Sequence, residues 1–204
     1  MGAAMSVLLL SGGLDSTILL AELCDRWIRP LCLTVYYGQR HAKEINAAEA
    51  VADFFRCQHK IVDLSGVFPA CPLTGAGDLP AGIAFDAPEQ AATIVPGRNA
   101  VLLSVAAAHA AGRQDAEVFI ACHASDEAVY PDCRPPFISS INAALKQSSG
   151  VSVEAPYLGM TRRQVVERGL VLDAPFHLTW SCYLGGETPC GRCGACVERK
   201  EAGA

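Results

Sequence analysis

The chain has 204 residues, of which 51% are hydrophobic and 18% charged, and its formal net charge is −5. This length and composition predict one globular domain with at most a small appendage and exclude an intrinsically disordered chain, while the acidic balance argues against a broad nucleic-acid surface. The apolar runs are too short or too interrupted to span a bilayer, and Met1–Leu10 lacks the features of a signal peptide, so we expect a soluble, cytoplasmic protein that does not engage membranes.

The first third of the chain predicts three strand–helix units. Apolar runs predict strands at residues 6–10, 31–35 and 59–64, and helical periodicity predicts one helix at residues 17–27 and another that ends near Phe55. This alternation favours an α/β fold with a doubly wound parallel sheet, in which ligands bind at the carboxyl ends of the strands.

Residues 65–92 are rich in Gly, Pro, Ala and Asp without a clear period, which predicts a long loop of the kind that forms lids or disordered segments. The pattern then predicts an alanine-rich helix that ends near Ala111, a strand at residues 117–122, helices at 135–148 and 161–168, and a short strand around 151–154. We divide the chain into a main domain at residues 1–175 and a C-terminal cysteine-rich segment at residues 176–204.

The segment Ser11-Gly12-Gly13-Leu14-Asp15-Ser16 joins the first predicted strand to its helix. A glycine turn at a helix N-terminus binds anions, because free N–H groups and the positive end of the helix dipole face the ligand. Asp15 would repel a phosphate and therefore suggests a bound Mg²⁺. The alternative is a plain strand-to-helix turn with a capping residue, since the segment matches neither a Walker A loop nor a dinucleotide fingerprint. It does resemble the SGGxDS pyrophosphate loop of N-type ATP pyrophosphatases, which cleave ATP between the α and β phosphates.

Four of the ten cysteines cluster near the C-terminus as Cys182, Cys190, Cys193 and Cys196, among glycines that permit tight turns. Since we expect no export, this spacing favours a metal over disulfides and predicts a closed, structural Zn²⁺ site. An iron–sulfur cluster and free thiols are the competing interpretations, and His177 is an alternative ligand that is more often a packed residue. The scattered cysteines are most simply small buried hydrophobes: Cys24, Cys32, Cys57, Cys71 and Cys122.

Three further loops carry polar residues that suit a ligand site. After the second predicted strand, Gln39 could read an amide or a base edge, and Arg40 and His41 could hold phosphate or carboxylate, although taken alone this stretch is better explained as a solvated helix start. In Pro96-Gly97-Arg98-Asn99, Arg98 could neutralise phosphate while Asn99 caps the next helix. Tyr130-Pro131-Asp132-Cys133-Arg134-Pro135 offers Cys133 only as a weak candidate nucleophile, since no adjacent base is identified.

Taken together and in this order, SGGLDST, YGQRH, VPGRN, YPDCRP and the ending TWSCY with CGRCGAC closely resemble the 7-cyano-7-deazaguanine synthase (QueC) family of queuosine biosynthesis, within the N-type ATP pyrophosphatase superfamily. The resemblance covers nearly the whole chain, from about Val7 to Cys196. It implies a homodimeric ligase that adenylates the carboxylate of 7-carboxy-7-deazaguanine with ATP and Mg²⁺. Ammonia then displaces AMP to give an amide, and a second ATP drives its dehydration to the nitrile.

The resemblance also implies roles for individual residues. It assigns contacts with ATP and pyrophosphate to Leu10, Ser11, Gly12, Gly13, Leu14, Asp15, Ser16 and Arg98. Candidates for the deazaguanine, ammonia or a metal are Gln39, Arg40, Asp126 and Asp132. The catalytic set that it implies is Asp15, Ser16, Arg98, Asp132 and Arg162, where Arg162 stands in the place of a phosphate-facing lysine and keeps its charge with a different geometry.

Two departures fall where the substrate or the nucleophile is expected to bind: Tyr36 precedes Tyr-Gly-Gln, and Glu127 replaces an aromatic that could stack on a purine-like ring. The altered Glu127 region motivates an alternative, a related ligase that joins the activated acid to the amine of a partner protein and stops at the amide. A non-catalytic, zinc-stabilised nucleotide-binding module is a third hypothesis, and the intact Asp15, Arg98 and Asp132 count against it. A thiouridylase or glutamine-dependent synthetase would share the loop, but no RNA-binding appendage or glutaminase domain is recognisable.

Overall fold

The computed structural model describes residues 6–113 and 115–204. Its five strands are all parallel and form one sheet in the order β3-β2-β1-β4-β5. The strands are β1 (Ser6–Leu9), β2 (Leu31–Tyr36), β3 (His59–Asp63), β4 (Glu117–Phe119) and β5 (Ser152–Glu154). This arrangement confirms the predicted doubly wound parallel sheet. Residues 1–5, part of the stretch expected to lack a signal peptide, lie outside the described residues.

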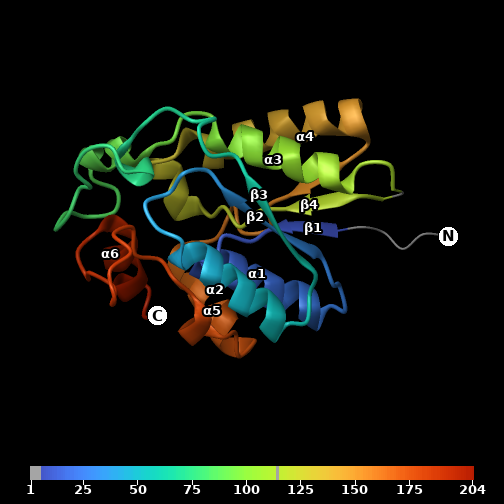
Figure 1. Ribbon diagram of the computed structural model, residues 1–204. Coiled ribbons are helices and arrows are strands. Elements are labelled where there is room, and N and C mark those ends of the chain that lie inside the picture. The colour runs from blue at the N-terminus through green and yellow to red at the C-terminus, as the bar shows by residue number, and fades with distance from the viewer. Residues whose placement is uncertain (1–5, 114) are drawn as a thin grey trace.

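Helices cover both faces of the sheet (Figure 1). One face carries α1 (Leu14–Asp25), α2 (Lys43–Phe54) and α5 (Arg162–Val171), and the other carries α3 (Arg98–Ala110) and α4 (Pro135–Ser149). Each face has its own apolar cluster, because the side chains of a buried strand point alternately to the two sides. On β1, Val7 packs in the cluster beneath α3 and α4, whereas Leu8 packs in the cluster with α1 and α2.

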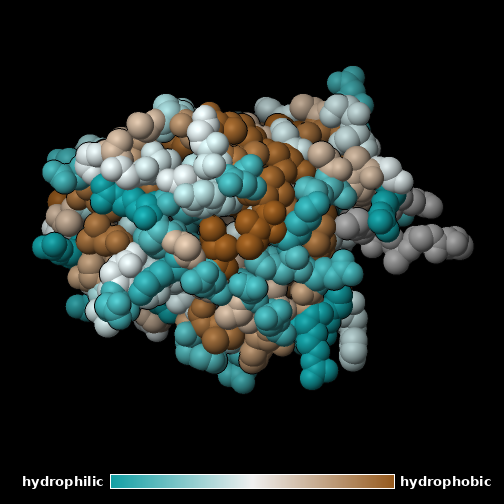
Figure 2. Space-filling model, in the orientation of Figure 1, coloured by the Kyte–Doolittle hydropathy of each residue, from teal (hydrophilic) through white to brown (hydrophobic). Residues whose placement is uncertain are grey.

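The edge strand β3 is less covered than the strands inside the sheet. Ile61 is 46% exposed, and partly buried apolar residues of β3 and α3, such as Val62 and Val105, pack at the rim of the core. Figure 2 shows the resulting patch of hydrophobic side chains where α3 passes the β3 side of the sheet. Every helix among the described residues is too short or too polar to cross a bilayer.

Several predicted boundaries differ from the structure. Helix α1 begins at Leu14 rather than Thr17, so Asp15 lies in its first turn. Strand β4 ends at Phe119, three residues before the predicted end, because the chain turns there into the pocket loops. Asn99 does not cap α3, because Gly97 occupies the cap position and Asn99 lies inside the helix. The cysteine-rich segment ends in a helix, α6 (Gly194–Glu201), that the sequence pattern did not predict.

The long loop at residues 65–92 contains two short 3₁₀ helices, at Pro72–Thr74 and Pro88–Thr93. It is fastened near its middle to the cysteine-rich segment: the N–H of Gly82 donates to the carbonyl of Arg192 at 2.7 Å, and Ala81 forms an isolated β-bridge with Cys193. The loop that was expected to be a lid or a disordered segment is therefore tied to the C-terminal segment.

Candidate active site

A pocket opens at the carboxyl ends of β1, β2 and β4, where the doubly wound sheet was expected to bind ligands. The long loop contributes Leu73 and Phe85 to its wall. Ten of the residues to which the resemblance assigns a role line the pocket: Leu10, Ser11, Gly13, Leu14, Asp15, Ser16, Gln39, Arg98, Asp126 and Arg162. The weak candidate nucleophile Cys133 and the expected cap Asn99 line it as well. The fold thus gathers residues from five separate segments of the chain around one cavity.

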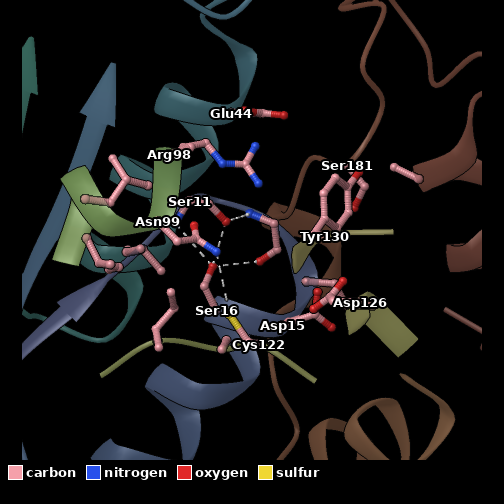
Figure 3. A pocket seen from close by; sticks show the side chains of 18 of the residues that line it. Ser11, Asp15, Ser16, Glu44, Arg98, Asn99, Cys122, Asp126, Tyr130 and Ser181 are labelled. Carbon is pink, nitrogen blue, oxygen red and sulfur yellow. Dashed lines mark hydrogen bonds between the residues drawn. The ribbon is translucent and has the colours of Figure 1, made fainter. Parts of the chain in front are cut away.

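The pyrophosphate loop, residues 11–16, is held by its own serines. The hydroxyl oxygens of Ser11 and Ser16 lie 3.0 Å apart, and Ser11 Oγ accepts a hydrogen bond from the N–H of Gly13 at 3.2 Å. Both serines line the pocket, as Figure 3 shows for their side chains. This loop therefore presents hydroxyl groups and the N-terminus of α1 to the cavity, which is a suitable environment for phosphate.

Gly12 lets the pyrophosphate loop approach α2 closely. Its φ is +79°, and a Cβ at this position would lie 2.1 Å from the carbonyl oxygen of Glu44 and 2.7 Å from the backbone nitrogen of Ala48. Both the left-handed backbone and the contact with α2 require glycine. Gly12 does not itself line the pocket; it sets the position of the residues that do.

Arg98 marks one side of the pocket. Its guanidinium carbon lies 5.7 Å from the ring centre of Tyr37 and 5.7 Å from that of Tyr130, and Figure 3 shows Arg98 extending towards Glu44. Burial raises the pKa of Glu44 to about 7, although Arg98 and Gln39 favour its charged form. A guanidinium among aromatic rings, with an acid close by, provides a site for a ligand that carries a negative charge and a planar group.

A cluster of charged side chains marks the other side. Arg162 Nε lies 3.1 Å from Asp15 Oδ1, and Arg162 Nη1 donates to Glu198 at 2.8 Å and to His123 Nε2 at 3.2 Å. His123 Nδ1 lies 3.6 Å from Asp126. Burial raises the pKa of Asp126 and of Glu198, while His123 and Arg162 respectively act in the opposite direction. Asp15 Oδ1 lies 3.8 Å from His123 Nε2, so both aspartates approach the same imidazole ring, and Figure 3 draws them near each other.

Other residues singled out from the sequence serve the surrounding structure. Arg40 lies outside the pocket lining and donates to the carbonyls of Pro72, at 2.7 Å, and Gly77 in the long loop. Asp132 Oδ2 accepts from the backbone N–H of Asn99 at 2.9 Å, so Asp132 caps α3, the role that the sequence assigned to Asn99. His41 was a candidate to hold phosphate or carboxylate, but its Nε2 lies 3.0 Å from the carbonyl oxygen of Cys182.

Gln39 and Cys133 also make local contacts. Although Gln39 lines the pocket, its Oε1 accepts from the N–H of Tyr37 at 2.8 Å and its Nε2 donates to the carbonyl of Val35 at 3.4 Å. Cys133 is buried, and its sulfur lies 3.3 Å from Asn99 Nδ2. Both departures from the family pattern, Tyr36 and Glu127, lie outside the pocket lining.

The four clustered cysteines form a second site. One sulfur from each lies within 4.8 Å of the other three, and Cys182, Cys193 and Cys196 are buried. Backbone N–H groups point at two of the sulfurs, from Cys190 to Cys182 Sγ and from Cys193 to Cys190 Sγ, each at 3.3 Å. Burial opposes ionisation of Cys190, but neighbouring N–H groups and thiols outweigh it and lower its pKa to about 7. Four sulfurs in this arrangement fit one tetrahedral metal ion.

Sequence reasoning assigned no role to several residues of the pocket, chiefly Glu44 and Glu198. Glu44 lies in the first turn of α2, the predicted helix that follows the loop of Gln39, so its place near the carboxyl end of β2 could have been inferred from its position. Glu198 follows the last clustered cysteine by two residues and gave no local signal, because its contact with Arg162 spans 36 residues. Tyr183 lay in a motif that was quoted for the resemblance, but it received no role.

Comparison with known proteins gives one consistent result. A sequence model of the family described as queuosine biosynthesis protein QueC matches residues 5–204. The 7-cyano-7-deazaguanine synthase of Archaeoglobus fulgidus is 44% identical over 203 residues, which cover 97% of this chain and 84% of that protein. The enzyme of the same name from Caldicellulosiruptor bescii is 39% identical over 202 residues, which cover 97% of this chain and 91% of that protein.

Among solved structures, the NMN synthetase from Francisella tularensis matches with a TM-score of 0.52 and 14% sequence identity, covering 93% of this chain and 71% of that one. At this identity the match reports the fold alone. It agrees with the α/β fold and its parallel sheet.

Proposed function

The chain belongs to the QueC family of queuosine biosynthesis, whose members are ATP-dependent enzymes that form C–N bonds, and on this basis we propose that it converts 7-carboxy-7-deazaguanine and ammonia to 7-cyano-7-deazaguanine. The observation that supports this most directly is one pocket with a pyrophosphate loop, an arginine between two tyrosines, and a cluster of acids. The proposal includes action in the cytoplasm as a homodimer.

In the first step the substrate carboxylate attacks the α-phosphate of ATP, which forms the acyl adenylate and releases pyrophosphate. A carboxylate oxygen is a poor leaving group, whereas AMP is a good one, so ammonia can then displace it to give the amide. Hydroxyl and N–H groups of the pyrophosphate loop, with Arg98, line the pocket and would stabilise the departing pyrophosphate.

In the second step the amide oxygen attacks another ATP, and elimination of AMP with loss of two protons from the nitrogen leaves the nitrile. Asp126 and Asp15 line the pocket near one another and are the candidates to receive protons or to orient ammonia. The pKa of Asp126 is raised by burial, which makes it a better proton acceptor than an exposed aspartate.

Two metals belong to the proposal. Asp15, at the start of α1, would hold a Mg²⁺ that neutralises phosphate charge; its buried Oδ1 is paired with Arg162 Nε at 3.1 Å but accepts no hydrogen bond, so it keeps lone pairs for a metal. The four clustered cysteines would hold a structural Zn²⁺, and their closed set of sulfurs leaves no open position for a substrate.

We propose the free nitrile as the product rather than a conjugate with a partner protein. The conjugating ligase was suggested by Glu127, but this side chain is absent from the pocket lining, and its carbonyl is used by Arg134 at 3.0 Å. The Glu127 side chain therefore forms no part of the pocket wall and offers no contact to a protein acceptor within the pocket.

The test is mass spectrometry of the products from purified protein supplied with ATP, Mg²⁺, ammonium and 7-carboxy-7-deazaguanine. We expect the nitrile, with two pyrophosphates released for each nitrile formed. A matched control is Arg26→Ala, which removes an exposed guanidinium at the C-terminal end of α1, the end away from the pyrophosphate loop, and should leave the product unchanged. Accumulation of amide or adenylate without nitrile would contradict the proposal and favour the conjugating ligase.

A further inference from the structure

Glu198 lies outside every recognised motif, yet it completes the charged cluster of the pocket. It is carried by α6, two residues after Cys196, and only 7% of its surface is exposed. Its Oε2 accepts a hydrogen bond from Arg162 Nη1 at 2.8 Å. Through this carboxylate the C-terminal segment reaches the pocket of the main domain.

The contact fixes the orientation of Arg162. A guanidinium is planar, so a bond that fixes Nη1 also fixes the direction of Nε. In this chain Nε then lies 3.1 Å from Asp15 Oδ1 in the pyrophosphate loop. His123 supports the same orientation, because its Nε2 lies 3.2 Å from Nη1 and accepts from it when the ring is neutral.

The orientation matters for phosphate binding. Asp15 would repel the phosphates of ATP if its charge were uncompensated, and Arg162 places a positive charge directly beside it. Arg162 is 8% exposed, so solvent screens this interaction weakly. An arginine that turned away from Asp15 would leave a bare carboxylate at the phosphate site.

His123, Asp126 and Glu198 have ligand atoms within 4.8 Å of one another, a spacing that could also suit a metal ion. However, Arg162 Nη1 already contacts both His123 and Glu198 and supplies the positive charge between them. The geometry therefore favours an arginine held by acids over a second metal site.

We propose that Glu198 is a positioning residue that holds Arg162 against Asp15 and so prepares the pyrophosphate loop for ATP. The inference rests on the proposed function, because it takes the pocket to be the ATP site.

The test compares two substitutions that both remove the carboxylate charge. Glu198→Gln keeps an oxygen that can accept from Arg162, whereas Glu198→Ala does not. By isothermal titration calorimetry, we expect Glu198→Ala to bind MgATP about tenfold more weakly than Glu198→Gln, the effect of losing one hydrogen bond to a charged group. In an Arg162→Met background the difference should fall below about twofold, since the partner is gone.

Three controls accompany the test. Glu201→Ala removes an exposed carboxylate from the same helix and should leave MgATP binding within about twofold of the unaltered protein. Glu198→Met, which is close to glutamate in volume but has no acceptor, should behave like Glu198→Ala without leaving a cavity. Metal content and melting temperature verify that each variant is folded.

Equal dissociation constants for Glu198→Gln and for the folded Ala and Met variants would overturn the proposal, as would an undiminished difference in the Arg162→Met background. The unaltered protein separates this inference from the proposed function. If it binds MgATP but makes no nitrile, the function is wrong and the comparison at Glu198 still stands. If it makes the nitrile while the constants are equal, only the role of Glu198 is wrong. Failure to bind MgATP would overturn both.

Discussion

Replacing Gly12 with alanine should destabilise the fold more than replacing a glycine whose added Cβ would meet no neighbouring atom. The residue has a φ of +79°, and the new Cβ would lie 2.1 Å from the carbonyl oxygen of Glu44, well inside van der Waals contact. The position of a Cβ is fixed by its own backbone, and the carbonyl oxygen belongs to the backbone of α2. Neither atom can therefore rotate away as the end of a flexible side chain would. Relief requires the pyrophosphate loop and α2 to separate.

The expected cost has two parts. A left-handed backbone costs a residue with a Cβ about 1–2 kcal/mol, and overpacking a well-packed contact costs about 1–3 kcal/mol, so Gly12→Ala should lower the free energy of unfolding by about 2–5 kcal/mol. Gly150→Ala is the matched control. Its φ is +73°, and no heavy atom lies within 4 Å of the added Cβ, so only the backbone part, about 1–2 kcal/mol, should appear.

Urea unfolding followed by circular dichroism at 25 °C measures both variants against the unaltered protein. Costs that agree to within about 0.5 kcal/mol would refute the reasoning, because the contact with α2 would then contribute nothing. Gly12→Ala should also weaken MgATP binding, whereas Gly150→Ala should not, since only the former displaces the loop.

Three further predictions concern the pocket and the cysteines. Asp15→Ala should reduce pyrophosphate release at least about 100-fold while the far-ultraviolet circular dichroism spectrum is retained; release at the normal rate would contradict the role of Asp15. Cys193→Ser should lose bound zinc, measured by mass spectrometry of the metal, together with thermal stability, because metal binding is coupled to folding; an unchanged melting temperature would argue against a structural site. The pKa of Glu44 is raised in the folded state to about 7 from 4.5, so the native state binds more protons than the unfolded chain between these values and its stability falls as pH rises through them. Glu44→Gln should therefore gain about 2–3 kcal/mol of stability relative to the unaltered protein between pH 4.5 and pH 8 in urea titrations, and a constant difference would show that Glu44 titrates normally.

The sequence predicted the sheet and the pyrophosphate loop because both depend on local patterns. Apolar runs such as Val7–Leu10 have few alternatives to a buried strand, and the glycine turn after them places Ser11 and Asp15 at the strand end whatever the rest of the chain does. Arg98 was placed in the pocket for the same reason, since it begins a helix at the carboxyl side of the sheet.

The remaining site residues depend on contacts between distant segments. Both Asp126 and Asp132 follow β4, but only the former lines the pocket, because a tight turn directs Asp132 to the N-terminus of α3. Arg40 is turned away by carbonyls of a loop more than thirty residues further along. Glu198 meets Arg162 only after α6 has folded beside the main domain. Residue type gives no indication of such partners.

The attachment of Gly82 and Ala81 to the cysteine-rich segment has a consequence for protease resistance. A long loop is normally the first place where a protease cuts, because its backbone can unfold locally into the enzyme's cleft. Here the middle of the loop is held by Arg192 and Cys193, so the exposed chain is divided into two shorter spans that each end at a fixed point. Cleavage near Gly82 should therefore follow the integrity of the cysteine cluster, and a simple digestion pattern reports whether the wall of the pocket is in place.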